Sequence, residues 1–403
     1  MNDFPLLRNV QASVGEHDGR RMVTFFDPAN FCETPISVSL PAFFVMSMMD
    51  GSRSVEILCE EFEAQFGQPM EPGEVAGLVH ALDEAYLLDN ERFRGRKKAV
   101  TDEFNSLKTR PAAFAGKSYP DDSAELKGVL DSLLKSAATD EPANGLKAVV
   151  VPHIDFRVGG DMMAAGWSRA AKSGAELFII LGIGHALTDD FFACIDKDFE
   201  TPAGTMRVDG EFIANFSKNF GEDILGNAHA HRTEHSIEFA ALFMAHIFGR
   251  NPAVTAVPIL LSFPEEALKM DHPLFNVRRI AKFIEALKKT VSESGRKACY
   301  AASVDFAHVG QRFGDSHAVD GRELDRIKTD DTALLSALAR IDNEAFVNQI
   351  ERKNKTNRVC GFPALYTLIA ASGARSGQVL GYRQNVEGEN ENVVSFATMA
   401  LHG

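Results

Sequence analysis

Long apolar runs are missing from this 403-residue chain, and none approaches the about 20 residues that a membrane-spanning helix needs. Its start, Met1-Asn2-Asp3-Phe4-Pro5, lacks the charged and apolar regions of a signal peptide. Positive charge is also in deficit, with 42 Lys and Arg against 56 Asp and Glu, which argues against nucleic acid as a partner. We therefore expect a cytoplasmic protein that binds neither a membrane nor nucleic acid.

Cysteine is scarce, and its five positions are scattered without any Cys-x-x-Cys spacing. This excludes a zinc ribbon, and the odd count does not suggest a disulfide framework. A cysteine with a function is therefore expected to act alone. The five are Cys32, Cys59, Cys194, Cys299 and Cys360.

The length suits two domains, and the hydrophobic content of 45% is enough for substantial cores. Residues 1–98 are predicted to form a small module, and residues 99–147 a linker with a leading helix. Residues 148–403 are predicted to form the main domain.

The module is expected to begin with a strand over the apolar run 43–49. Ser54 can then cap a helix that Gly67 ends, and a second helix begins near Pro72. This small α+β plan resembles PqqD-like and winged-helix modules, which implies a peptide-binding or partner-binding role. A plain structural cap explains the same pattern equally well.

In the main domain, strands alternate with helices, which predicts an α/β fold with a mixed, largely parallel sheet covered by helices on both faces. The expected strands are 148–151, 177–182, 253–262, 298–304 and 392–400. The expected helices are 161–173, 210–219, 235–248 and 275–290, and helical stretches are expected over about 320–352 and 362–372.

Three of these strands run directly into polar residues. His153 follows the first strand, His185 the second, and Asp305 with His308 the strand that ends at Val304. Loops beyond the carboxyl ends of parallel strands are where ligands bind, so the three loops predict one shared site. A structural histidine and an aspartate that caps a helix are the alternatives.

Two further features concern chemistry. The stretch His229 to Glu238 concentrates histidine and glutamate before an apolar helix, with His235 as a candidate catalytic residue. Cys360 directly precedes a helix, whose N-terminus lowers the pKa of a thiol, and this suits a metal thiolate or a redox-active sulfur. A solvated loop and an inert buried cysteine are the alternatives.

Taken together, these segments resemble the MEMO family, whose bacterial and archaeal members are named AmmeMemoRadiSam system protein B. The resemblance extends over residues 108–403. It rests on five motifs in register: Pro152-His153, Leu181-Gly182-x-x-His185, Glu234-His235-Ser236-Ile237-Glu238, Ser303-x-Asp305-Phe306-x-His308, and Cys360-Gly361-Phe362-Pro363.

The family is similar in fold to class III extradiol dioxygenases, which use non-haem iron. The resemblance implies that His153, His185 and Cys360 bind the metal and that His308, steered by Asp305, acts as the acid/base. A cysteine stands where the ring-cleaving enzymes have a carboxylate, which favours other redox chemistry. Asp155 is a further candidate ligand through its His-x-Asp spacing.

The leading hypothesis is therefore a metal-binding, dioxygenase-like protein that holds Fe(II), with copper second and zinc less favoured. The system name implies a radical SAM protein and a third component as partners, and the substrate is expected to be a small molecule or a peptide. The alternatives are a non-enzymatic peptide- or protein-binding module that uses the same cleft, and a zinc-type hydrolase.

Overall fold

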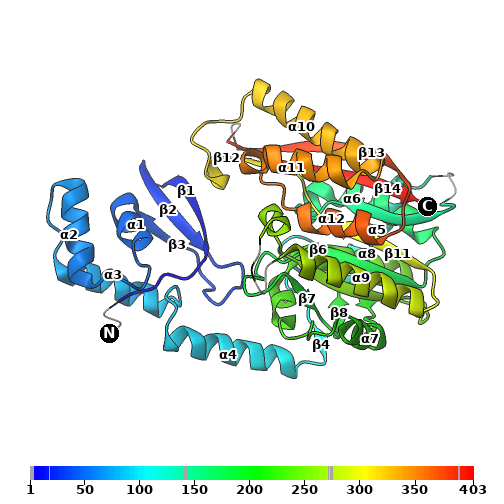
Figure 1. Ribbon diagram of the computed structural model, residues 1–403, viewed down its shortest axis with the longest axis horizontal. Coiled ribbons are helices and arrows are strands. Elements are labelled where there is room, and N and C mark those ends of the chain that lie inside the picture. Colours follow the sequence, from blue (N-terminus) through cyan, green and yellow to red (C-terminus); the bar gives the residue numbers. More distant parts are fainter. Residues whose placement is uncertain (1–3, 18, 140–142, 271, 273–275, 389–390) are drawn as a thin grey trace. The chain divides into compact units, whose positions relative to one another are not determined.

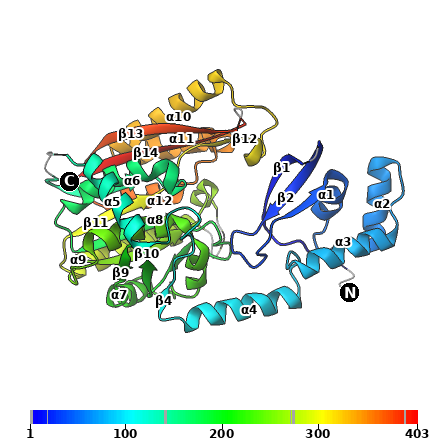
Figure 2. The same cartoon turned by 180° about the vertical axis from the view of Figure 1, so that it is seen from behind.

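The structure is a computed structural model that describes residues 4–17, 19–139, 143–270, 272, 276–388 and 391–403 (Figures 1 and 2). The chain divides into two compact units. Unit 1 comprises Met1–Ser106 with Gln311–Ser316, and unit 2 comprises Leu107–Gly310 with His317–Gly403. The predicted boundary at residue 98 falls inside a helix that continues to Ser106.

Unit 1 begins with a three-stranded antiparallel sheet in the order β1-β2-β3, followed by four helices. The sequence prediction missed this sheet. The elements are β1 (Gln11–His17), β2 (Arg20–Phe26), β3 (Ile36–Ser39), α1 (Leu40–Ser47), α2 (Val55–Phe66), α3 (Pro72–Glu84) and α4 (Glu91–Ser106).

The strand predicted over 43–49 was wrong, because most of that run lies in helix α1. Ser39 caps this helix with its hydroxyl on the Ala42 N–H, and Pro41 stands in the first turn. These start signals outweigh the apolar pattern, which by itself does not separate a buried strand from a buried helix.

The helix signals in the next segment are confirmed. Ser54 caps α2, and Gly67 ends it in the left-handed conformation at φ 66°. Pro72 is the first residue of α3. The inner faces of these helices form the core of unit 1 with Val23 and Phe25 of β2.

Unit 2 contains an eight-stranded mixed sheet in the order β12-β14-β5-β11-β6-β10-β7, with β13 paired to β14. The four central strands β5, β11, β6 and β10 are parallel, whereas the flanking strands are antiparallel. The sheet is therefore mixed, as predicted, with its parallel part confined to the centre. Its strands are β5 (Leu146–Val151), β6 (Leu177–Ile183), β7 (Phe192–Cys194), β10 (Thr255–Leu261), β11 (Ala298–Ser303), β12 (His308–Gly310), β13 (Ser376–Glu387) and β14 (Asn392–His402).

Helices cover both faces of this sheet, and Figures 1 and 2 show it between them. Ala148 and Val150 of β5 point to the core beneath α7, α9 and α12. On the other face α6 packs closely, because a Cβ at Gly166 would lie 2.3 Å from Val151. The helices of unit 2 are α5 (Ser123–Ser136), α6 (Phe156–Ala171), α7 (Gly210–Phe220), α8 (His235–Phe248), α9 (Val277–Glu293), α10 (Gly321–Ala339), α11 (Asn343–Asn357) and α12 (Phe362–Ala371).

A second, three-stranded sheet has the order β4-β8-β9, with β8 parallel to β4 and antiparallel to β9. Its strands are β4 (Thr109–Arg110), β8 (Asp198–Thr201) and β9 (Gly204–Met206). The short helical turns of unit 2 are η1 (Ala228–Thr233) and η2 (Glu265–Leu268). A further turn, η3 (Gln311–Phe313), belongs to unit 1. Among the described residues, the helices are all too short or too polar to cross a membrane.

Candidate metal centre

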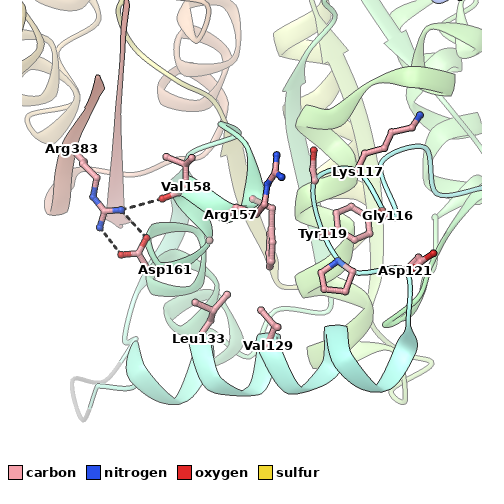
Figure 3. Close-up of a pocket in the computed structure, with 14 residues that line it drawn as sticks. Gly116, Lys117, Tyr119, Asp121, Val129, Leu133, Arg157, Val158, Asp161 and Arg383 are labelled. Carbon is pink, nitrogen blue, oxygen red and sulfur yellow. Dashed lines mark hydrogen bonds and ion pairs between the residues drawn. The ribbon is translucent and has the colours of Figure 1, made fainter. Parts of the chain in front are cut away.

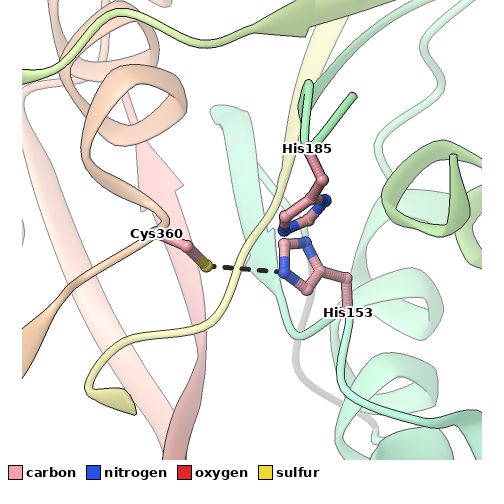
Figure 4. A group of neighbouring side chains, drawn as sticks. All are labelled: His153, His185 and Cys360. Atoms are coloured by element: carbon pink, nitrogen blue, oxygen red, sulfur yellow. Dashed lines mark hydrogen bonds between the residues drawn. The ribbon is translucent and has the colours of Figure 1, made fainter. Parts of the chain in front are cut away.

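The parallel strands β5, β6 and β11 end at the same edge of the sheet, and their loops bring the predicted residues together. His153 follows β5, His185 follows β6, and Cys360 reaches the same place from the residue pair before α12. Figure 4 shows the three side chains facing one another. One ligand atom from each lies within 4.8 Å of the other two.

His153 is almost fully buried, at 2% exposure, and is held on both sides. Its Nδ1 lies 2.9 Å from the Ser303 carbonyl, and its Nε2 lies 3.5 Å from the Cys360 Sγ. A carbonyl can only accept, so Nδ1 carries the proton and the Nε2 lone pair faces the thiol. Burial lowers the pKa of this imidazole well below its usual value, which keeps it neutral.

His185 is anchored by Glu234, the N-cap residue of α8. The Glu234 carboxylate accepts from the His185 backbone N–H at 3.0 Å and from its Nδ1 at 3.1 Å. Burial opposes a charge on this imidazole, but Glu234 and the Cys360 thiol outweigh burial and raise its pKa to about 10. The same contacts lower the pKa of Glu234 despite its burial.

His235, the first residue of α8, lies against both of these histidines. Its ring stacks on His185 at 4.8 Å between centroids and lies 5.0 Å from the ring of His153. Its Nδ1 is 3.3 Å from Glu234, so one carboxylate holds two imidazoles. Burial lowers the pKa of His235 to about 4, and the neutral form therefore prevails.

Glycine allows this helix to approach the strand. A Cβ at Gly182 would lie 2.6 Å from the Ser236 Oγ and 2.7 Å from Ile237, which is closer than side chains tolerate. Ser236 in turn accepts the Ile183 N–H and donates to the Ile183 carbonyl, both at 3.1 Å. The first turn of α8 therefore packs directly against the end of β6, which only glycine at position 182 permits.

Asp305 is buried and faces His153. Its Oδ1 accepts the His153 backbone N–H at 3.1 Å, and its Oδ2 lies 3.8 Å from the His153 Nε2. Burial raises its pKa to about 7, although the backbone hydrogen bonds from His153 and Ile154 oppose this. A carboxyl with this pKa can hold or release a proton near neutral pH.

His308 was predicted to be steered by Asp305, and the two side chains are arranged differently from that expectation. The His308 Nδ1 lies 3.1 Å from the Phe306 carbonyl, while Asp305 turns toward His153. Arg358 donates to the His308 carbonyl at 3.1 Å. Among the described residues, two groups have ligand atoms within 4.8 Å of one another: His153, His185 and Cys360, and His185, Glu234 and His235. His308 belongs to neither group.

Asp155, the further candidate ligand, is the N-cap residue of α6. Its Oδ1 accepts the Arg157 backbone N–H at 3.0 Å, and its carboxylate pairs with the Arg157 guanidinium at 2.8 Å and 3.0 Å. The residue is thus used by the helix start, as a cap aspartate typically is.

The position of Cys360 before α12 led us to expect a lowered thiol pKa. Burial instead raises this pKa, and the nearby His185 only partly opposes the effect. The Cys360 Sγ lies 3.6 Å from the Asp305 carbonyl. A Cβ at Gly361 would lie 2.8 Å from that same carbonyl oxygen, so glycine is needed where the two loops meet.

Sequence reasoning did not include Glu234 among the site residues, although it noted the cluster. It also missed the buried pair of Arg110 and Glu238. Glu238 accepts the N–H groups of Ala113 and Phe114 and the hydroxyl of Tyr119, and thereby fixes the segment before α5 against α8. The available signal was Glu238 itself, because it is a carboxylate one helical turn after Glu234 in an otherwise largely apolar helix.

A cavity of about 760 Å³ opens beside the start of α6 (Figure 3). Val129 and Leu133 of α5 form an apolar wall, and Arg383 at the rim pairs with Asp161. The rings of Tyr119 and Phe156 line it and pack on Phe239, which packs in turn on His235. These aromatic contacts connect the cavity to the histidine cluster.

The fold and the cluster define a mixed α/β protein with a His, His, Cys centre at the carboxyl edge of its parallel strands. The family model described as "Memo-like protein" matches residues 110–400. The chain belongs to this family.

Several MEMO1 family proteins are similar to the chain. One from Aquifex aeolicus is 28% identical over 377 residues, which cover 91% of this chain and 94% of its own length. One from Thermus thermophilus is 26% identical, covering 88% of this chain and all of its own. One from Methanopyrus kandleri is 27% identical, and the match covers 72% of this chain and 98% of the relative's length. The relative therefore has no counterpart for the remaining part of this chain.

Proposed function

We propose that the chain is a metal-dependent redox protein in which His153, His185 and Cys360 hold the ion. The observation that carries this is the anchoring of both histidines through Nδ1. Ser303 and Glu234 occupy those nitrogens, and this leaves each Nε2 for a metal, as is usual for metal-binding histidines.

Iron in the Fe(II) state is the proposed metal, with copper as the second candidate. Two imidazoles and a thiolate suit either ion, and the resemblance to class III extradiol dioxygenases favours iron. The bound metal would supply one-electron redox chemistry. With zinc, the same ligands would form the site of a hydrolase. Spectroscopy separates this case from the redox protein, because zinc is spectroscopically silent.

The other polar residues are proposed to manage protons and to orient the ligands. Asp305, with its pKa of about 7, holds a proton 3.8 Å from the His153 Nε2 and can release it near neutral pH. Glu234 orients His185 and His235. His308 stays a candidate acid/base. A small molecule or a peptide is the proposed substrate, and the apolar cavity beside Phe156 offers room for its apolar part.

The test is elemental analysis of protein purified without oxygen, beside the variants His153→Ala and Cys360→Ala. Near-stoichiometric iron or copper that both variants lose supports the proposal. The matched controls are His317→Ala and Cys59→Ala, which change the same residue types outside the cluster. Metal-free wild-type protein after anaerobic reconstitution contradicts it, as does metal that both site variants retain.

A second proposal concerns unit 1, which we infer to be a PqqD-like or winged-helix module that binds a peptide or a partner. Its separate core supports this, as does the Methanopyrus kandleri relative that covers only 72% of the chain. A radical SAM protein and a third system component are the proposed partners. Co-purification with these proteins, lost on substitution of the exposed Phe26 and Phe66, would support it. Partner binding that persists in metal-free protein, but requires the cleft that contains the candidate metal ligands, would favour the non-enzymatic binding module.

A further inference from the structure

The opposite edge of the sheet in unit 2 carries a cavity of about 440 Å³. It lies at the amino ends of β5 and β11 and is bounded by α9 and the end of α12. At about 3.3 Å per residue, the run from Lys147 to His153 separates this cavity from the candidate metal centre by roughly 20 Å. The two sites are therefore distinct.

Positive charge dominates the walls of this cavity. Lys147, Lys288, Arg296 and Lys297 line it, and among the described residues it has no carboxylate in its lining. Lys288 pairs with Glu285 at 2.7 Å, and Arg296 pairs with Asp209. This leaves two cations whose charge the described lining does not balance.

Lys147 and Lys297 are those two cations. Both side chains are exposed at the cavity, and neither forms an ion pair or hydrogen bond with any residue in the described ranges. The chain as a whole carries a net charge of −14, so an uncompensated positive hollow stands out against its surroundings. Such a hollow attracts anions.

Tyr300 provides an independent observation. It lines the same cavity from β11 with only 3% of its surface exposed, and within the described part of the chain its hydroxyl has no hydrogen-bond partner. Among the described residues the hydroxyl is not one of the fully buried polar atoms that lack a partner, so it reaches the solvent in the cavity and can donate to a ligand there. Burial also raises the pKa of this phenol, so it stays a neutral O–H donor. An acceptor placed in the cavity would satisfy it.

We propose that this cavity binds a small phosphorylated organic molecule through its phosphate group. Lys147 and Lys297 neutralise the charge, and the Tyr300 hydroxyl donates to a phosphate oxygen. Leu146 and Val291 add apolar wall for the organic part. The volume is in the range of small-molecule sites, and it is too small for a protein segment of any length.

The test measures binding of ribose 5-phosphate and of inorganic phosphate to the full chain by calorimetry at low ionic strength. We expect saturable binding, tighter for ribose 5-phosphate. The variant Lys147→Gln/Lys297→Gln should weaken it at least about tenfold, because it removes two charge-assisted contacts, and Tyr300→Phe should weaken it about fivefold. Metal content should not change in either variant.

The matched control is Lys269→Gln/Lys328→Gln, which removes the same charge from exposed lysines elsewhere in unit 2. It should bind within about twofold of the wild type. The fluorescence of buried Trp167 reports whether each variant is folded, and Tyr300→Phe preserves the shape of the wall. Lack of saturable binding, or an equal loss in the control, overturns the proposal. Equal affinity for inorganic phosphate overturns the assignment to an organic ligand.

Discussion

Arg110 and Glu238 form a fully buried ion pair that joins the segment before α5 to the helix beginning at His235. The Arg110 guanidinium also donates to the carbonyls of His231 at 3.0 Å and Glu234 at 3.1 Å. The pair thus supports the turn that carries Glu234, one of the groups anchoring the candidate metal centre.

Replacing Arg110 with Met keeps an apolar stem of similar length but removes the charge. Glu238 then stays buried without its counter-charge, and three carbonyls, those of His231, Glu234 and Pro111, lose a donor. Removing one partner of a buried pair costs about 3–5 kcal/mol, so we expect unit 2 to lose that much of its free energy of unfolding. Tyr119→Phe removes one hydrogen bond to the same carboxylate and should cost about 1.5–3 kcal/mol.

Trp167 is the single tryptophan of the chain and is fully buried in α6, so its fluorescence follows the unfolding of unit 2 in urea. A cycle of Arg110→Met, Glu238→Gln and the double variant measures the coupling between the two side chains. We expect the double variant to lose at least about 1 kcal/mol less than the sum of the single losses. A loss below about 1 kcal/mol for Arg110→Met, with additive energies, would refute the reasoning.

Three further predictions concern buried charges. Glu234→Gln removes the carboxylate that anchors two histidines, and should weaken metal binding about 10–100-fold in a chelator competition. Metal binding at pH 7.5 should release about two protons, from His185 and Cys360, because the pKa of His185 is about 10 and that of the thiol is raised. Calorimetry in buffers of different ionisation enthalpy measures this number. Burial raises the pKa of Asp331 to about 6, so its neutral form stabilises the fold below about pH 4, and this contribution is lost as pH rises through 6. From pH 4 to 8, Asp331→Asn should gain up to about 3 kcal/mol of unfolding free energy relative to the wild type.

Each of these three has a clear contrary result. Unchanged metal affinity in the Glu234 variant would mean that His185 is oriented by other contacts. Binding without proton release would mean that the thiol and imidazole are not both ligands. A stability difference that stays constant between pH 4 and 8 would mean that Asp331 is ionised throughout.

The main domain could be predicted in detail because its elements are periodic and their ends are marked. The helix predicted over 235–248 is α8 itself, and the strand predicted over 177–182 is β6 with one more residue. Strand β13 was missed because its residues are mostly half-exposed and polar, so neither alternation nor an apolar run marks it. In the first sheet of unit 1, strand β3 has no buried residue, whereas β2 alternates buried Val23 and Phe25 with more exposed residues, a pattern that we overlooked.

The candidate ligands His153 and His185 could be found because each follows a strand, and strand ends converge at a sheet edge. Their anchoring partners could not. Ser303 contributes only a backbone carbonyl, which every residue has, and Glu234 is 49 residues from His185 in the chain. The turn of Asp305 toward His153 rather than His308 likewise depends on how two loops pack, and no local pattern encodes that.

The electrostatics of the cluster follow from one carboxylate among three imidazoles. The rings of His153, His185 and His235 lie within 5.2 Å of one another, so a charge on one opposes a charge on the next. Glu234 resolves this by its contacts with His185, the histidine whose pKa rises, while burial keeps the other two neutral. A cation that takes the His185 Nε2 would displace its proton, but the Nδ1 bond to Glu234 would persist. Glu234 therefore serves the protonated and the metal-bound states alike, which explains why an anchoring carboxylate suits this position better than a ligating one.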